Sequence, residues 1–293
     1  MEKEAPDYLL VQGDTTTAMA ASLAAFYRGV KVGHVEAGLR TWNKLHPFPE
    51  EVNRRIIDSV SDLYFAHTKA ARQNLINEGV DPKKIEVTGN TVIDALLSTA
   101  KRKASFEGTS LEKISFNGRK MMLMTAHRRE NFGQDIINIC KAVKEIVQKF
   151  EDEVYFVYPV HLNPNVQNPV RSMLSGIDNV LLTEPLEYLP FVHLMKKAYL
   201  VLTDSGGLQE EAPSLGKPVL VMRETTERPE GVQAGCVEVI GTDTQRIVRK
   251  VTQRLENKRK YQRMAKAKNP YGNGTAAQKI VKRMLKEAIS YKP

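Results

Sequence analysis

Three carboxylates stand just after apolar runs or at the start of a helical segment. Asp14 follows the run at 8–11, Glu36 follows the run at 30–35, and Glu50 opens a helical pattern after Pro49. Ligands of parallel α/β sheets bind at the carboxyl ends of strands, so we expect these side chains at one sheet edge. Crowded carboxylates have separated pKa values, which suits one to act as a base and another as an acid. Asp14 could equally be a helix N-cap, and Glu50 with Glu51 could simply favour a helix dipole.

A basic cluster follows the apolar run at 121–124. It begins at His127 and continues with Arg128 and Arg129. Two guanidinium groups and an imidazole in one loop could bind phosphate oxygens. Surface ion pairs with Glu130 would explain the same residues equally well. His161 stands at the next expected strand end and could face the same site.

A glycine-opened helix follows the run at 199–203. The chain passes through Ser205, Gly206 and Gly207 into a helical pattern that contains Glu211. The N-terminus of such a helix presents unpaired N–H groups and a positive dipole end, which together hold a phosphate. A carboxylate one or two turns further on can accept hydrogen bonds from ribose hydroxyls. The pattern therefore predicts a nucleotide site, and a second strand-to-polar transition at 219–230 brings Arg228 to it.

Several other kinds of site are not indicated. The sequence has no metal-ligand spacing, no GxGxxG after a strand and no GxSxG nucleophile elbow. Cys140 and Cys236 lie far apart, and Cys140 fits a small core residue. We expect neither a metal nor a tightly bound dinucleotide, and a reducing, cytoplasmic setting.

The composition is that of a globular protein with a basic balance. The 293 residues carry a formal net charge of +9, and no run of about 18 apolar residues suggests a membrane span. The charge admits nucleic acid as a partner. However, most of the excess lies between 246 and 286 along helical stretches without interleaved aromatics, so a solvated helix face is the better interpretation.

The elements that position these residues alternate along the chain. Apolar runs stand at 8–11, 30–35, 63–66, 85–87, 121–124, 154–158, 180–182, 200–202, 219–222 and 237–240, with helical patterns such as 136–147 and 247–255 between them. This alternation predicts an α/β protein with parallel sheets. Ten strands exceed one ordinary sheet, so we expect two Rossmann-like domains, at 1–100 and 119–270. The final helix, at about 275–290, is expected to pack back on the first domain.

Six motifs, in chain order, resemble the bacterial non-hydrolysing UDP-N-acetylglucosamine 2-epimerase family. They are the segments 13–17, 34–41, 47–51, 125–131, 204–207 and 226–230, and the likeness covers nearly the whole chain. The resemblance implies a fold of the glycosyltransferase B type, with a UDP-sugar between the domains. It implies interconversion of UDP-N-acetylglucosamine and UDP-N-acetylmannosamine without a redox cofactor, through loss of the carbon 2 proton and departure of UDP.

The resemblance also assigns roles. Asp14, Glu36 and Glu50 would be the carboxylates of proton transfer, and His127 would act beside them at the departing pyrophosphate. The substrate-binding residues would be Ser205, Gly206, Gly207, Glu211 and Arg228. A second UDP-sugar would activate the enzyme through Arg128 and His161. We also expect a homodimer that supplies cell-surface polysaccharide precursors.

One departure from the family concerns the start of the chain. Family members begin with a strand and a loop containing Gly-Thr-Arg-Pro-Glu, and neither occurs in this sequence. The first domain also has only about four strand candidates. We therefore expect an N-terminally incomplete first domain, and a fragment or internal-start product with impaired activity. A UDP-sugar-binding module without turnover and a glycosyltransferase of the same fold remain as alternatives.

Overall fold

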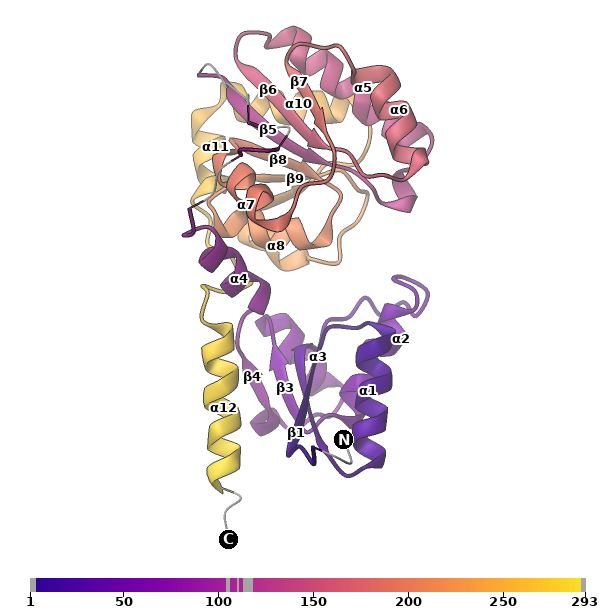
Figure 1. Cartoon of the computed structure of the whole chain (residues 1–293), viewed down its shortest axis with the longest axis vertical. Coiled ribbons are helices and arrows are strands. Elements are labelled where there is room, and N and C mark those ends of the chain that lie inside the picture. The colour runs from indigo at the N-terminus through magenta and orange to yellow at the C-terminus, as the bar shows by residue number, and fades with distance from the viewer. Residues whose placement is uncertain (1–3, 104–105, 110, 113–117, 291–293) are drawn as a thin grey trace. The chain divides into compact units, whose positions relative to one another are not determined.

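Residues 4–103, 106–109, 111–112 and 118–290 are described by the computed structural model of the chain (Figure 1). All ten apolar runs form strands, and every strand pairing in the two sheets is parallel. The predicted α/β class with two parallel sheets is therefore confirmed. The chain folds into two compact units, residues 1–95 with 270–293 and residues 96–269. These are called the first and second unit below.

The first unit contains a four-stranded sheet and its helices. Its elements are β1 (Tyr8–Gln12), α1 (Thr16–Tyr27), β2 (Lys31–Ala37), α2 (Glu50–Val60), β3 (Leu63–Ala66), α3 (Lys69–Asn77), the 3-10 turn η1 (Pro82–Lys84), β4 (Ile85–Val87), α4 (Thr91–Thr99, which continues into the second unit) and α12 (Ala276–Ser290). The strands lie in chain order, β1-β2-β3-β4. Their carboxyl ends therefore form one edge of the sheet.

Helices cover both faces of this sheet. Successive side chains of a strand point to opposite faces, so each face contributes its own set of buried residues. Val11 and Val32 pack with α1 and α2 on one face. Ile280 of α12 packs with Val35 and Phe65 on the other face, and Figure 1 shows α12 across the sheet from α1. β3, which is covered on both faces, is buried in every position and carries Leu63, Tyr64, Phe65 and Ala66.

The second unit contains a six-stranded sheet. Its elements are β5 (Lys120–Thr125), the 3-10 turn η2 (Arg129–Asn131), α5 (Gln134–Lys149), β6 (Val154–Pro159), α6 (Pro164–Leu174), β7 (Val180–Thr183), α7 (Tyr188–Lys197), β8 (Leu200–Thr203), α8 (Gly206–Ser214), β9 (Val219–Val221), α9 (Pro229–Ala234), β10 (Val237–Val239), α10 (Thr244–Glu256) and α11 (Lys258–Ala265). The order is β10-β9-β8-β5-β6-β7. It reverses between β5 and β8, the place where ligands bind in doubly wound sheets.

The passage between the units differs from the expected linker at 101–119. The first unit ends at Ala95, because Leu96 and Ala100 at the end of α4 already pack in the core of the second unit. The division falls inside helix α4, and the helical pattern at 91–99 continues across it without a change. The sequence therefore does not show where the first unit ends. Residues 104–105, 110 and 113–117 of the expected linker lie outside the described residues.

Candidate active site

Asp14 follows β1 at the carboxyl edge of the first sheet. The N-cap of α1 is Thr15, whose hydroxyl accepts the Ala18 N–H at 3.1 Å, so Asp14 is not the helix cap. Instead, Arg54 of α2 donates to Asp14 Oδ2, and the Asn53 side chain donates to the Asp14 backbone carbonyl at 2.9 Å. The structure shows no hydrogen bond to Oδ1 within the described part of the chain. One oxygen of the carboxylate is thus anchored while the other is available.

Glu36 lies in the next strand, beside the Asp14 loop. Its backbone φ is +70°, in the left-handed region, and the register of β2 with β3 shifts between Val35 and Ala37. A non-glycine residue in this region is strained by roughly 1–3 kcal/mol, and such strain gathers at functional sites. A Cβ added to Gly13 would lie 3.8 Å from Glu36 Oε2. The bulge therefore turns this carboxylate toward the loop that carries Asp14.

Glu50 and Glu51 begin α2 but have different surroundings. Glu51 is fully buried and accepts the backbone N–H groups of Thr41 at 3.0 Å and Trp42 at 3.1 Å, together with Arg54 Nη1 at 3.0 Å. Glu50 Oε2 is buried without a hydrogen-bond partner among the described residues. A buried carboxylate oxygen left unpaired is costly unless a ligand or a proton completes it. Glu51 is therefore a structural anchor, and Glu50 is the candidate for chemistry.

Buried charges lie beneath this edge. Asp58 of α2 binds His34 Nδ1 at 2.6 Å and Arg40 Nη2 at 2.6 Å, and His34 Nε2 contacts the Gly13 carbonyl at 2.8 Å. Burial alone would raise the pKa of Asp58, but the charges and hydrogen bonds of His34 and Arg40 outweigh it and hold this pKa below its ordinary value. Because Arg40 also binds Glu78 at 2.6 Å, the whole group ties β2, α2 and α3 together.

Asp204 organises the carboxyl edge of the second sheet, where the strand order reverses. It follows β8 and is fully buried. Its Oδ2 accepts the backbone N–H groups of His127 and Arg128, both at 2.8 Å, and the Asn131 side chain at 3.0 Å. Asp204 thereby fixes the loop after β5 against the start of α8.

His127 and His161 come together at this edge. Their rings stack with centroids 5.5 Å apart, and His127 Nδ1 lies 3.4 Å from Asp204 Oδ1. Burial lowers the pKa of His127; Asp204 opposes this, whereas His161 and Arg128 add to the lowering. The imidazole is therefore predominantly neutral at neutral pH and can donate a single N–H.

The N-terminus of α8 presents free backbone donors. Its N-cap, Ser205, makes no side-chain capping bond, and the first turn holds no acidic residue. Gly206 is buried and Gly207 is exposed. A Cβ added to Gly206 would lie 3.2 Å from the nearest side-chain atom, whereas a Cβ added to Gly207 would lie 4.0 Å from its nearest side-chain atoms. This is the geometry of an anion site at a helix N-terminus.

Charged side chains surround that helix end. Arg128 Nη2 lies 3.3 Å from Glu227 Oε1, and Arg223 binds Glu227 at 2.6 Å and Glu130 at 2.5 Å. Arg128 and Glu130 thus both form ion pairs, but Arg128 pairs with Glu227 and Glu130 pairs with Arg223, and the two do not pair with each other. Arg129 is exposed. The Arg128 guanidinium is consequently held beside Gly206, within reach of a bound anion.

Two glutamates of α8 have separate environments. Glu211 is 8% exposed and accepts the Tyr188 hydroxyl at 3.3 Å. Burial, assisted by Glu210 and opposed by the Tyr188 hydrogen bond, raises the pKa of Glu211 to about 7. Arg228 donates to Glu210, so its guanidinium is already engaged in an ion pair. A raised carboxyl pKa next to a helix N-terminus is typical of a functional residue.

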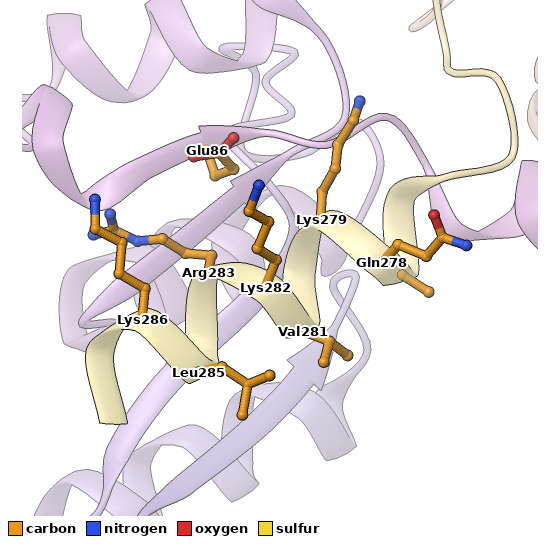
Figure 2. A pocket seen from close by; sticks show the side chains of 9 residues that line it. Glu86, Gln278, Lys279, Val281, Lys282, Arg283, Leu285 and Lys286 are labelled. Atoms are coloured by element: carbon orange, nitrogen blue, oxygen red, sulfur yellow. The ribbon is translucent and has the colours of Figure 1, made fainter. Parts of the chain in front are cut away.

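A pocket of about 1200 Å³ lies along α12 (Figure 2). It is lined by Glu86 and by basic and apolar side chains of α12, and none of the candidate site residues contributes to it. Within the described ranges, no group of three or more His, Cys, Asp or Glu side chains is arranged for a metal ion. No described helix is long and apolar enough to cross a membrane.

Comparisons with known proteins decide the family. The family model described as UDP-N-acetylglucosamine 2-epimerase matches residues 1–285. The chain belongs to this family. It is 52% identical to the Escherichia coli UDP-N-acetylglucosamine 2-epimerase over 291 residues, which is 97% of this chain and 77% of that protein.

Solved structures agree. The Neisseria meningitidis UDP-GlcNAc 2-epimerase bound to UDP-GlcNAc has a TM-score of 0.88 and 50% identity, and the match covers 97% of this chain and 78% of that one. The Methanocaldococcus jannaschii UDP-GlcNAc 2-epimerase in complex with UDP-GlcNAc and UDP has a TM-score of 0.76 and 35% identity, covering 97% and 77%. The family resemblance seen in the sequence is thereby confirmed.

Sequence reasoning missed several residues of the site. His34 showed no partner in the sequence, and Arg54, Asp58 and Asp204 were not singled out for any role. One signal existed: the polar residues Glu51, Arg54 and Asp58 recur at helical spacing on α2, where a core-facing helix usually carries apolar side chains.

Proposed function

We propose that this epimerase interconverts UDP-N-acetylglucosamine and UDP-N-acetylmannosamine without hydrolysis. A carboxylate removes the proton at carbon 2 while the bond between carbon 1 and the UDP oxygen breaks, and its electron pair leaves with UDP. The intermediate is a 2-acetamidoglucal. A second acid returns a proton to the opposite face, and UDP adds back to carbon 1. The family and its ligand-bound relatives support the substrate.

The buried, unpaired oxygen of Glu50 supports this chemistry most directly. Weakly acidic carbon-bound protons need a positioned carboxylate base and a separate acid. Glu50, Asp14 and Glu36 would share these two tasks. Asp14 is anchored through one oxygen, and Glu36 is directed to the same edge by its bulge.

The second unit would hold the nucleotide. The free N–H groups at the start of α8, near Ser205 and Gly206, would bind the pyrophosphate and stabilise the charge that develops on it. His127 would donate a further hydrogen bond, and Gly207 would contribute its backbone N–H at the same helix end. Arg228 would add positive charge close to the helix, and Glu211 would accept the ribose hydroxyls.

Regulation and assembly belong to the same proposal. Arg128 and His161 would contact a second UDP-sugar that activates the enzyme; the stacking of His161 on His127 supports communication with the reacting site. We also propose a cytoplasmic homodimer that supplies polysaccharide precursors and uses no redox cofactor, metal or nucleic acid. Family membership does not favour a glycosyltransferase or a binding module without turnover.

Product analysis tests the proposal. UDP-N-acetylglucosamine is incubated with the purified chain and the products are separated by anion-exchange chromatography and identified by NMR. We expect UDP-N-acetylmannosamine, with no free N-acetylmannosamine. Release of free sugar and UDP would indicate hydrolysis, and an unchanged substrate with normal UDP binding would refute the assignment for this chain.

A further inference from the structure

Helix α2 has an unusual buried face. Of its five buried residues, one is apolar, whereas Glu51, Asn53, Arg54 and Asp58 are polar or charged. Burying charges is unfavourable unless each is paired, and replacing such pairs with apolar side chains often stabilises a protein. The charges on the inner face of α2 are therefore weak evidence for added stability, and a further role is worth seeking. The partners of these charges show what that role is.

Arg54 connects the loop that carries Asp14 to the segment that follows β2. Its Nη2 donates to Asp14 Oδ2 in the loop after β1, and its Nη1 donates to Glu51 Oε2 at 3.0 Å. Glu51 in turn holds the backbone of Thr41 and Trp42, downstream of Glu36. Arg54 is only 4% exposed. Glu51 thus holds one nitrogen of the guanidinium in place, and a second nitrogen binds the Asp14 carboxylate.

We propose that Arg54 is a positioning residue for the Asp14 carboxylate in proton transfer at carbon 2. By occupying Oδ2, it orients the carboxylate so that Oδ1 is presented to the substrate. Lysine cannot do the same, since one ammonium does not reproduce the planar fork that joins two carboxylates. This inference rests on the proposed epimerisation and adds to it a residue that does not touch the sugar.

A purely structural role would have different consequences. If Arg54 only stabilised the fold, its loss would lower the folded fraction and leave the turnover number of the folded protein unchanged. If it bound UDP directly, nucleotide affinity would fall with turnover. A positioning role predicts a loss of kcat without either change, and partial restoration by a guanidinium ion that enters the space left by the side chain.

The experiment compares Arg54→Ala and Arg54→Lys with Arg55→Ala. Arg55 is the adjacent residue of the same helix; its side chain is 55% exposed and lies 3.9 Å from Glu78, so it is a matched control. For each protein we would measure kcat, deuterium incorporation at carbon 2, UDP affinity by calorimetry and folding by fluorescence of Trp42, the single tryptophan. Guanidinium chloride at non-denaturing concentration is the rescue agent.

We expect Arg54→Ala to lower kcat and deuterium incorporation about 100-fold, the scale of a misplacement of about 1 Å. UDP affinity should stay within about twofold. Guanidinium should raise the activity of Arg54→Ala alone, Arg54→Lys should be intermediate, and Arg55→Ala should match the wild type.

A folded Arg54→Ala with nearly wild-type kcat would overturn the proposal, as would a parallel loss of UDP affinity. If Arg54→Ala does not fold, Arg54→Lys decides, and wild-type turnover in that variant would refute the role. Failure of the wild type itself to epimerise would overturn the proposed function and, with it, this inference. Variants that match an active wild type would overturn the Arg54 role alone.

Discussion

The two units use the same place in a parallel sheet in opposite ways. In the first unit, the carboxyl edge is built from buried ion pairs that position carboxylates, among them Arg54 with Asp14 and Asp58 with His34. In the second unit, one buried aspartate, Asp204, organises a loop, and the candidate anion site consists of backbone N–H groups at α8. In the proposed function this difference is a division of labour, with proton transfer at the first edge and nucleotide binding at the second.

The largest expected effect comes from substituting Glu50, one of the two glutamates that begin α2. Glu50→Gln should lower kcat by about 10²–10⁴-fold, the range for loss of a general acid or base, and leave UDP affinity unchanged. Steady-state kinetics and calorimetry check both. Glu51→Gln is the control: because Glu51 accepts three hydrogen bonds, its loss should lower stability by about 1–3 kcal/mol. Equal loss of turnover and UDP affinity in Glu50→Gln would contradict the division.

Asp58→Asn should make the first unit less stable. Removing the charge that faces His34 and Arg40 should lower the free energy of unfolding by about 3–5 kcal/mol. Urea titration followed by Trp42 fluorescence reports on this unit. UDP binding below the unfolding transition should be unaffected. A variant with wild-type stability would show that the buried network does not hold this edge together.

Glu211 should make stability depend on pH in the second unit. Its pKa is raised to about 7 in the folded protein from an ordinary 4.5, so the folded state favours the protonated form. The associated stability is fully present below about pH 4.5 and is lost as the pH rises through 7. At pH 8 the Glu211→Gln variant should therefore be more stable than the wild type by about 2–3 kcal/mol.

Hydrogen exchange of the amides in β8 and α8, measured at pH 5 and pH 8, checks this difference. UDP should bind the variant more weakly, since its side chain accepts ribose hydroxyls less well than a carboxylate. A stability difference that does not change between the two pH values would refute the assigned burial effect.

The smallest expected effect concerns the glycines of α8. In Gly206→Ala, the new methyl group would lie 3.2 Å from Glu227 Oε1 and 3.4 Å from Arg128 Nη2. The displaced charges should weaken UDP binding about tenfold, which corresponds to about 1.4 kcal/mol. Gly207→Ala has more room and should change affinity less. Calorimetry decides, and the reverse order would mean that the phosphate lies nearer Gly207.

Sequence patterns predicted the fold and the local geometry at the start of α8 better than the charged network of the first unit. Strands such as β3 and β8 are buried in every position and mostly apolar, and all ten strands coincide with apolar runs of the sequence. A strand followed by Ser205, Gly206 and Gly207 is a local signal, and the structure places these residues at an uncapped helix end. The uncapped helix end could be located from the sequence because its residues are neighbours in the chain, and its role as an anion site stays a prediction.

The charged network could not be predicted in the same way. Arg54 lies 40 residues from Asp14, and Asp58 lies 24 from His34, so no local pattern connects them. Glu50 and Glu51 resembled residues that favour a helix dipole, and Asp14 resembled an N-cap although Thr15 is the cap. Only the tertiary structure distinguishes an anchored Glu51 from an unpaired Glu50.

Proton NMR of the wild-type chain with UDP-N-acetylglucosamine in deuterium oxide tests the central claim most directly. If carboxylates of the first unit exchange the carbon 2 proton with solvent, UDP-N-acetylmannosamine will form with deuterium at carbon 2. Product that retains the original proton at carbon 2, or a folded, UDP-binding protein without exchange or new sugar, would contradict the account.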